Sequence, residues 1–410
     1  MKNNQRNLDR RNFLKTASLA GIGAAISKNT FGEQNAESPQ TQKIDKPQSG
    51  MPMRKLAKCD VKVPILSQGA MYDVTQNQIS IVAGIRRGIT YLDTAGGYAG
   101  GKSEIGIGNY IKDNPEKRKD LFIVTKASRA RNIEQIEQRL QTSLQRMNTD
   151  YVDLYFGVHG LDHPEQLTPE LKEWAESAKK RGLIKYFGFS THRNMVECLQ
   201  RASELDWIDA IMTVYNFRLM QDSDMQQAIE NCHKKGIGLI AMKVLAHGQE
   251  IDPDEANEVT RHFLKQGLTQ AQAKIKAVLE DKRISSACVR MQNISEINEN
   301  AAAVLDSKSL SGYDRDVFSK FAFATCSGYC ACCAKCDSAI PDAPYISEIM
   351  RYLMYHDSYG DKARARKLFR EIPDSAKRKL AKVDLSEAEK ICPQNLQIGK
   401  LVNQAFKKLA

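Results

Sequence analysis

Polar side chains stand at the ends of seven apolar, β-branched segments of this 410-residue chain. A single polar residue at such a place means little. Seven in register predict a functional site, because buried charges need partners or a pocket. Two of them are lysines, which could form a Schiff base with a carbonyl compound, as in an aldolase. The strand-end residues are Asp93, Lys126, His159, Ser190, the pair Tyr215-Asn216, Lys243 and Arg290.

The segments that carry these residues alternate with helical stretches of 3.6-residue periodicity. Gly88, Gly182 and Gly236 each follow a last turn rich in Lys and Arg, so we expect them to end helices. Eight strand–helix units predict a (β/α)₈ TIM barrel, whose active-site residues lie at the carboxyl ends of the strands. A doubly wound open sheet is the alternative. The expected strands are 63–70, 89–95, 121–127, 151–159, 185–191, 209–216, 237–244 and 284–290.

The segment after the second expected strand has two interpretations. Gly96-x4-Gly101-Lys102-Ser103 matches the phosphate-binding loop G-x-x-x-x-G-K-[ST], which would indicate a P-loop nucleoside triphosphatase. Against this, Asp93 would repel a phosphate, and the loop would stand in the second of eight units. The other strand-end residues would also be left without a role, so this is the minor alternative.

In the second interpretation the same residues, Asp93-Thr-Ala-x2-Tyr98-x2-Gly101-x-Ser103-Glu104, resemble the signature of the aldo-keto reductase family. The likeness extends over roughly residues 54–305, with agreement in order and spacing. It continues through Val124-Thr-Lys126, Tyr151 to His159-Gly160, Gly182 to Ser190-Thr-His, Tyr215-Asn216, Gly236 to Lys243, and Arg290 to Asn300.

The resemblance implies an NAD(P)-dependent oxidoreductase that transfers hydride between nicotinamide and a small carbonyl or alcohol substrate. Asp93, Tyr98, Lys126 and His159 would form its catalytic tetrad. Tyr98 would be the general acid and base, and the Lys126 ammonium would lower its pKa from an ordinary value of about 10. Asp93 would hold Lys126, and His159 would donate a hydrogen bond to the carbonyl oxygen. A Schiff-base aldolase would leave Tyr98 without a role.

The resemblance also implies a cofactor pocket made of Ser190, Tyr215, Asn216, Lys243, Arg290 and Asn300. Arg290 could pair with a 2′-phosphate, but Glu296 stands where many relatives have a second cation, so NAD and NADP both stay open. Met212 and Met242 replace residues that contact the nicotinamide in many relatives. These replacements suggest the alternative of a catalytically weak barrel used for binding or electron transfer.

Five of the ten cysteines lie within residues 326–336, and Cys330-x2-Cys333-x2-Cys336 has iron–sulfur spacing. With Cys392-Pro393, this region resembles the ferredoxin-like tail of a subset of aldo-keto reductases. The resemblance implies one [4Fe–4S] cluster, on Cys326, Cys330 and Cys333 with Cys336 or Cys392 as the fourth ligand. Disulfides and a zinc site are the alternatives.

The N-terminal residues resemble a twin-arginine export signal. Arg10-Arg11 precede Phe13-Leu14-Lys15 and an apolar stretch that is too short to anchor a protein. They predict an exported, periplasmic protein that uses the twin-arginine machinery, carries its cofactor bound and needs a redox partner or second substrate to regenerate it. The expected organisation is a signal at 1–32, a linker at 33–52, the barrel at 53–310 and a helical, cysteine-rich tail at 311–410.

The net charge of +11 belongs to the two ends of the chain. Residues 1–58 carry eleven Lys/Arg and four Asp/Glu, and residues 361–410 carry thirteen and six, so each end has +7 and the middle has −3. A nucleic-acid enzyme would need positive potential around its groove, which argues against that class. No apolar run approaches the roughly 20 residues of a membrane-spanning helix, so we expect no integral membrane segment.

Overall fold

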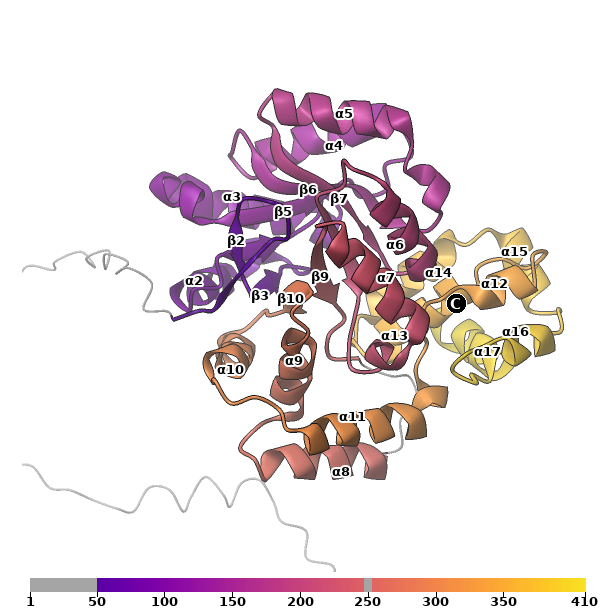
Figure 1. Ribbon diagram of the computed structural model, residues 1–410. Helices are drawn as coiled ribbons and strands as arrows, with labels where there is room; N and C mark the ends of the chain where they lie inside the picture. Colours follow the sequence, from indigo (N-terminus) through magenta and orange to yellow (C-terminus); the bar gives the residue numbers. More distant parts are fainter. Residues whose placement is uncertain (1–49, 247–252) are drawn as a thin grey trace, which may run out of the picture. The chain divides into compact units, whose positions relative to one another are not determined.

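The computed structural model describes residues 50–246 and 253–410. Eight parallel strands close into a barrel in the order β10-β3-β4-β5-β6-β7-β8-β9 (Figure 1). The predicted (β/α)₈ barrel is therefore confirmed, and the alternative of an open sheet is wrong. The barrel strands are β3 (Leu66–Gly69), β4 (Tyr91–Asp93), β5 (Phe122–Lys126), β6 (Val152–Leu161), β7 (Ile184–Thr191), β8 (Ala210–Val214), β9 (Gly238–Met242) and β10 (Ile284–Arg290).

Two regions of the chain precede this barrel in the sequence. An antiparallel pair, β1 (Met53–Lys55) and β2 (Lys62–Pro64), precedes it. Leu56 and Val63 of this hairpin pack with apolar residues from inside the barrel, which include Phe122 and Leu154. The predicted export signal at 1–32 and all but the last residues of the linker at 33–52 lie outside the described residues.

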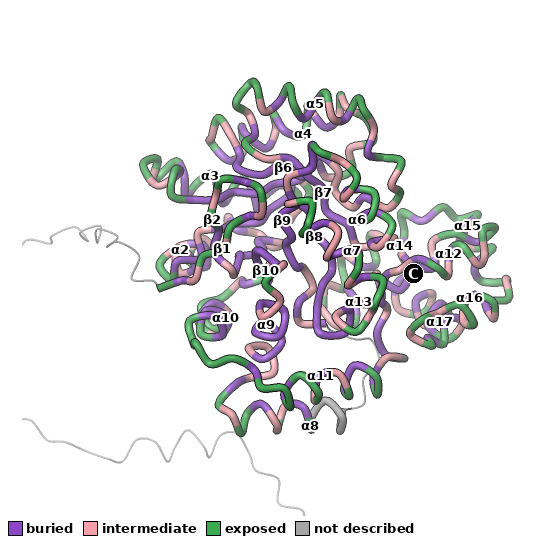
Figure 2. The backbone as a smooth tube through the Cα atoms, viewed as in Figure 1, coloured by how far each residue is buried: buried purple, intermediate pink, exposed green. Residues whose placement is uncertain are grey.

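Helices surround the strands, and each buries one face (Figure 2). In α4, Ile136, Leu140 and Leu144 recur at helical spacing and are buried, as an amphipathic surface helix requires. The helices around the barrel are α2 (Gln78–Arg86), α3 (Lys102–Asp113), α4 (Ile133–Arg146), α5 (Pro169–Lys180), α6 (Met195–Glu204), α7 (Ser223–Lys234), α8 (Pro253–Leu264), α9 (Gln270–Glu280) and α10 (Ile294–Leu305).

The three predicted helix-ending glycines are confirmed. Gly88, Gly182 and Gly236 each follow the C-cap residue of α2, α5 and α7, and they have φ of 81°, 74° and 78°. This left-handed conformation is strained for residues with a Cβ atom, so glycine allows the chain to turn from each helix into the next strand.

The predicted C-terminal helical extension is also confirmed, and among the described residues no helix is long and apolar enough to cross a membrane. Its first helix shares the apolar core of the barrel, where the rings of Phe318 and Phe321 lie 4.9 and 5.8 Å from the ring of Phe217. The later helices share a second core that begins at Ala343. The extension consists of α11 (Gly312–Ala324), α12 (Lys335–Ala339), α13 (Ile346–Asp357), α14 (Lys362–Glu371), α15 (Asp374–Leu380), α16 (Ser386–Lys390) and α17 (Ile398–Leu409).

One arginine ties this extension to the barrel. Arg193, between β7 and α6, donates to Glu348 Oε1 at 2.8 Å and to Asp337 Oδ2 at 2.9 Å. The two carboxylates belong to α13 and α12, and both are largely buried. Asp337 is therefore a docking residue. The barrel and the C-terminal helices together form one unit.

Candidate active site

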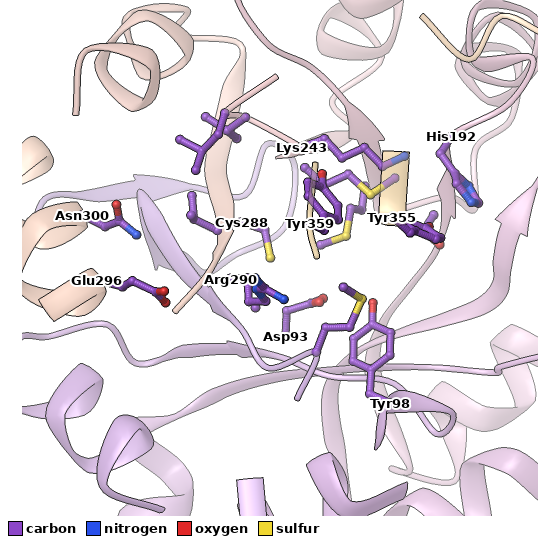
Figure 3. A pocket seen from close by; sticks show the side chains of 18 of the residues that line it. Asp93, Tyr98, His192, Lys243, Cys288, Arg290, Glu296, Asn300, Tyr355 and Tyr359 are labelled. Atoms are coloured by element: carbon purple, nitrogen blue, oxygen red, sulfur yellow. The ribbon is translucent and has the colours of Figure 1, made fainter. Parts of the chain in front are cut away.

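A cavity of about 350 Å³ opens at the carboxyl ends of the barrel strands (Figure 3). This is where active-site residues of (β/α)₈ barrels lie. The residues Asp93, Lys126, His159, Ser190, Lys243 and Arg290, predicted from the strand ends, all line it, together with Tyr98 and Asn300. Closure of the barrel thus brings together side chains that are separated by up to about 200 residues in the sequence.

A buried ion pair lies at the centre of the cavity floor. Lys126 Nζ is 2.6 and 2.8 Å from the two carboxylate oxygens of Asp93, and it also donates to the backbone oxygen of Thr94 at 2.7 Å. The lysine side chain is 1% exposed. Burial opposes its charge, but the attraction of Asp93, the interaction with Tyr98 and the hydrogen bond to Asp93 together outweigh burial and raise the pKa of Lys126 above its ordinary value. Lys126 is therefore a permanent ammonium.

Tyr98 is held in position by an unusual backbone. It begins a 3₁₀ turn, Tyr98–Gly101, in which Ala99, Gly100 and Gly101 have φ of 48°, 67° and 95°. The φ of Gly101 is one that residues with a Cβ atom rarely adopt, so glycine is favoured there, and a Cβ atom would also come 2.6 Å from the Arg146 guanidinium, which would have to shift. The turn places the Tyr98 ring with its centroid 5.0 Å from Lys126 Nζ.

The electrostatics of Tyr98 favour the protonated form. Burial raises the pKa of Tyr98, while the Lys126 ammonium and the Arg364 guanidinium work in the opposite direction. The net shift is upward. Near neutral pH Tyr98 is therefore protonated and can act as an acid. The neighbouring Lys126 ammonium would stabilise the tyrosinate that remains after proton transfer.

His159 lies beside Tyr98, with ring centroids 6.0 Å apart and an interplanar angle of 74°. Its Nδ1 is 3.0 Å from Ser128 Oγ, which itself accepts a hydrogen bond from the Gly97 N–H. The Ser128 hydroxyl proton is thus available to Nδ1, which leaves the imidazole proton on Nε2. Burial and the charges of Lys126, Arg364 and Arg351 lower the pKa of His159 to about 3. His159 is a neutral hydrogen-bond donor.

The residues of the phosphate-loop match have other partners. Ser103 Oγ is buried and donates to the backbone oxygen of Ala70 at 2.6 Å, and it shares a hydrogen bond with Thr94 Oγ1. Lys102 points to Asp73, with Nζ and Oδ2 3.0 Å apart, and neither Lys102 nor Ser103 lines the cavity. The loop therefore supports the position of Tyr98 and offers no phosphate cradle.

Two of the residues predicted to bind the cofactor are turned away from the cavity. The hydroxyl of Tyr215 donates to Asp281 Oδ2 at 2.6 Å. Asn216 is fully buried, and its amide donates to the Lys243 backbone oxygen and to the Tyr329 hydroxyl. Asn216 thus holds the segment that follows α11 in place through its hydrogen bond to Tyr329. Ser190 does line the cavity, and its Oγ accepts from the Gly160 N–H at 3.1 Å, which leaves its own proton to donate.

The C-terminal extension contributes residues that the sequence did not predict for the site. Tyr355 from α13, Tyr359 from the following loop and Arg364 from α14 line the cavity, as does His192 after β7. Tyr355 and Tyr359 stack with ring centroids 5.9 Å apart. The only sequence signal for them was a tyrosine-rich helix followed by a basic one, a pattern that fits any surface helix.

Four thiols of the predicted metal site surround a second, small cavity. Cys330, Cys333, Cys336 and Cys392 line it, whereas Cys326 does not. Its free space is about 20 Å³, roughly the room for one water molecule. All ten cysteines are free thiols. Within residues 50–246 and 253–410, no three His, Cys, Asp or Glu side chains stand close enough together to hold a metal ion.

Comparison with known proteins identifies the family. Residues 67–314, more than half of the chain, match the model of the aldo/keto reductase family. The chain therefore belongs to this family of oxidoreductases, as its signature at Asp93 to Glu104 predicted.

The chain is 26% identical to L-galactose dehydrogenase of Arabidopsis thaliana over 256 residues, which cover 57% of this chain and 79% of that protein. Two solved structures confirm the fold. An aldo-keto reductase from Bacillus halodurans in its holo form has 23% identity and a TM-score of 0.54, and the match covers 66% of this chain and 96% of that one. An aldo-keto reductase from Klebsiella pneumoniae in complex with NADPH also has 23% identity and a TM-score of 0.54, over 65% and 94%.

The neutral state of His159 leads to a testable prediction. We expect its imidazole to titrate near pH 3, compared with about 6.5 in the unfolded chain. Between these values the unfolded chain binds a proton that the folded chain does not, so the free energy of unfolding decreases as pH falls from about 6.5 to about 3. NMR of histidine-labelled protein, with a His159→Asn variant to assign the resonance, measures the titration. A midpoint between pH 6 and 7 would contradict the described environment.

Proposed function

We propose that this protein is a nicotinamide-dependent carbonyl reductase in which Tyr98 gives the proton to the oxygen of the substrate. The observation that carries the proposal is the convergence of a protonated tyrosine, a fixed ammonium and a neutral histidine on one cavity. When carbonyl carbon accepts hydride, negative charge develops on its oxygen. The Tyr98 hydroxyl and the His159 imidazole would then both donate to that oxygen, while Lys126 stabilises the charge left on Tyr98.

The lining of the cavity fits a nicotinamide dinucleotide in its chemistry. Asn300 offers an amide at one side of the cavity, the Tyr98 hydroxyl lies at the other, and the Arg290 cation lies between them (Figure 3). Ser190 has a hydroxyl proton that can bind an amide oxygen. Such a cofactor, when bound, would supply or accept the hydride. Arg290, Asn300 and Ser190 would hold it, with Met212 and Met242 as apolar neighbours.

Removal of the Tyr98 hydroxyl is the direct test. Tyr98→Phe should lower kcat for aldehyde reduction about 10²- to 10⁴-fold, the usual contribution of a positioned general acid. The assay follows oxidation of NADPH or NADH with a panel of small aldehydes. Tyr313→Phe is the matched control, because Tyr313 is an exposed tyrosine of α11 far from the cavity lining. Full activity of Tyr98→Phe would refute the assignment, and a wild-type protein that is inactive with every aldehyde would favour the binding or electron-transfer alternative.

The cysteine cavity supports a second part of the proposal, that the extension holds one iron–sulfur cluster. Cys330, Cys333, Cys336 and Cys392 provide the type and number of donors that a [4Fe–4S] cluster requires. The space between them fits about one water molecule, so the thiols would have to rearrange to admit the cluster. Cys326 of the predicted ligand set is placed elsewhere, so we assign the fourth position to Cys392.

Metal analysis tests this part. Protein purified without oxygen should contain about four iron and four sulfide per chain, as the cluster formula demands. Cys392→Ala should lose most of the iron, and Cys326→Ala should retain it as the matched control. Stoichiometric zinc, or a loss of free thiols through disulfides, would contradict the cluster.

We also propose that the N-terminal residues export the protein through the twin-arginine route to the periplasm. The paired Arg10-Arg11 before a weak apolar stretch support this. A reporter fused behind residues 1–52 should reach the periplasm of a bacterial host. A double change of Arg10 and Arg11 to lysine should hold it in the cytoplasm, whereas Arg6→Lys should have no effect. Export of the double variant would contradict the proposal.

A further inference from the structure

The C-terminal extension forms one wall of the catalytic cavity, and this wall is positively charged. Arg364 of α14 and Lys243, which follows β9, both line the cavity. Both cations are near the Tyr355 ring, whose centroid is 4.7 Å from the Arg364 guanidinium and 5.9 Å from Lys243 Nζ. The wall is fixed, because Arg193 binds α12 and α13 to the barrel.

Neither cation has a carboxylate partner among the residues that the structure describes. Lys243 Nζ is buried without any hydrogen-bond partner. Arg364 contacts Met71 Sδ and the Tyr355 ring. The nearby carboxylates are committed elsewhere, since Asp93 binds Lys126 and Glu348 binds Arg193. Glu296 and Glu299 also line the cavity, but among the described residues neither forms an ion pair with Lys243 or Arg364. A bound anion would therefore compensate these two cations.

The effect of these positive charges on the pKa values of neighbouring side chains also supports the binding of an anion. Burial by itself opposes ionisation of Tyr355, yet Lys243, Arg351 and Arg364 together lower its pKa below the ordinary value. His192, which also lines the cavity, accepts a hydrogen bond from Arg351. Burial and the charges of Arg351, Lys243 and Arg364 hold the pKa of His192 well below its usual range, so it adds no charge.

The cations lie on the side of the cavity where the reaction would take place. Lys243 extends toward His192 and Tyr355, away from Glu296 and Asn300 at the opposite side (Figure 3). Arg364 is close enough to Tyr98 and His159 to act on the pKa of both. An anion held by Lys243 and Arg364 would therefore lie next to the group that receives the proton.

We infer that Lys243 and Arg364 form a subsite for a carboxylate, and that the substrates are carbonyl compounds or alcohols that also carry a carboxylate group. This inference rests on the proposed reductase function. A guanidinium offers paired donors that match the two oxygens of a carboxylate, and an ammonium adds a point charge. The resemblance assigned Lys243 to the cofactor pocket, so a cofactor phosphate is the other anion that these cations could bind. The experiment therefore distinguishes a substrate carboxylate from a cofactor phosphate.

Kinetics with a charged and a neutral substrate of equal length test the subsite. Wild-type protein should prefer 4-oxobutanoate to its methyl ester by kcat/KM. Lys243→Met and Arg364→Met should each lower the ratio of the two kcat/KM values at least tenfold, because a hydrogen bond to a charged group contributes about 1.5–3 kcal/mol. Arg364→Lys should restore part of the ratio. Arg370→Gln, an exposed arginine of the same helix whose Nε donates to the Arg366 backbone oxygen, should leave the ratio unchanged.

The remaining outcomes are also decisive. The dissociation constant of NADPH, measured by fluorescence, should be the same in wild type and Arg364→Met. If Arg364→Met binds NADPH tenfold more weakly and the ratio of the two kcat/KM values is unchanged, the cations bind a cofactor phosphate and the inference is overturned. If wild-type protein reduces neither substrate, the aldehyde panel decides the proposed function, and calorimetric titration with 4-oxobutanoate and its ester decides the subsite. Selective binding of the acid, lost in Arg364→Met with an unchanged thermal unfolding midpoint, would support the subsite. Equal binding of acid and ester would refute it.

Discussion

The buried pair of Lys126 and Asp93 is the interaction on which the site depends. Removing two charges from water is costly unless geometry and additional hydrogen bonds compensate, and here three oxygens surround the ammonium at 2.6–2.8 Å. The fixed positive charge of Lys126 then influences the ionisation of the neighbouring side chains. It favours ionisation of Tyr98, against the effect of burial, and it helps to keep His159 neutral. Burial and this ion pair together therefore set the protonation states of Tyr98 and His159 that the proposed carbonyl reduction needs.

The C-terminal extension is part of the active site. Arg193 joins Glu348 and Asp337 to the barrel, and the helices held in this way place Arg364, Tyr355 and Tyr359 over the strand ends. In a (β/α)₈ barrel the catalytic residues lie at the carboxyl ends of the strands, and the segments that cover these ends determine which substrate binds. In this protein the extension covers the barrel mouth. Of the two residues of the inferred carboxylate subsite, Arg364 lies beyond the matched family region of 67–314, whereas Lys243 lies within it.

Much of the molecule follows from local patterns in the sequence. The barrel was predictable because β-branched strands, amphipathic helices and terminal glycines each act over a few residues, and Gly88, Gly182 and Gly236 have the predicted conformation. Four members of the site could be named for a related reason. A parallel barrel brings all strand ends to one rim, so Asp93, Lys126 and His159 had to meet wherever the strands ended, and a short loop delivers Tyr98 to the same rim.

What the sequence alone determined is therefore the barrel, its family and the residues around Tyr98, because these depend on short-range periodicity and on a fold with one functional face. Only the tertiary structure decided which way side chains turn and which distant helices meet. Tyr215 and Asn216 end a strand, but their partners Asp281 and Tyr329 hold them away from the cavity. Arg364 reaches the catalytic residues from nearly the end of the chain. No periodicity encodes such contacts, because they arise from packing between elements that are remote in sequence.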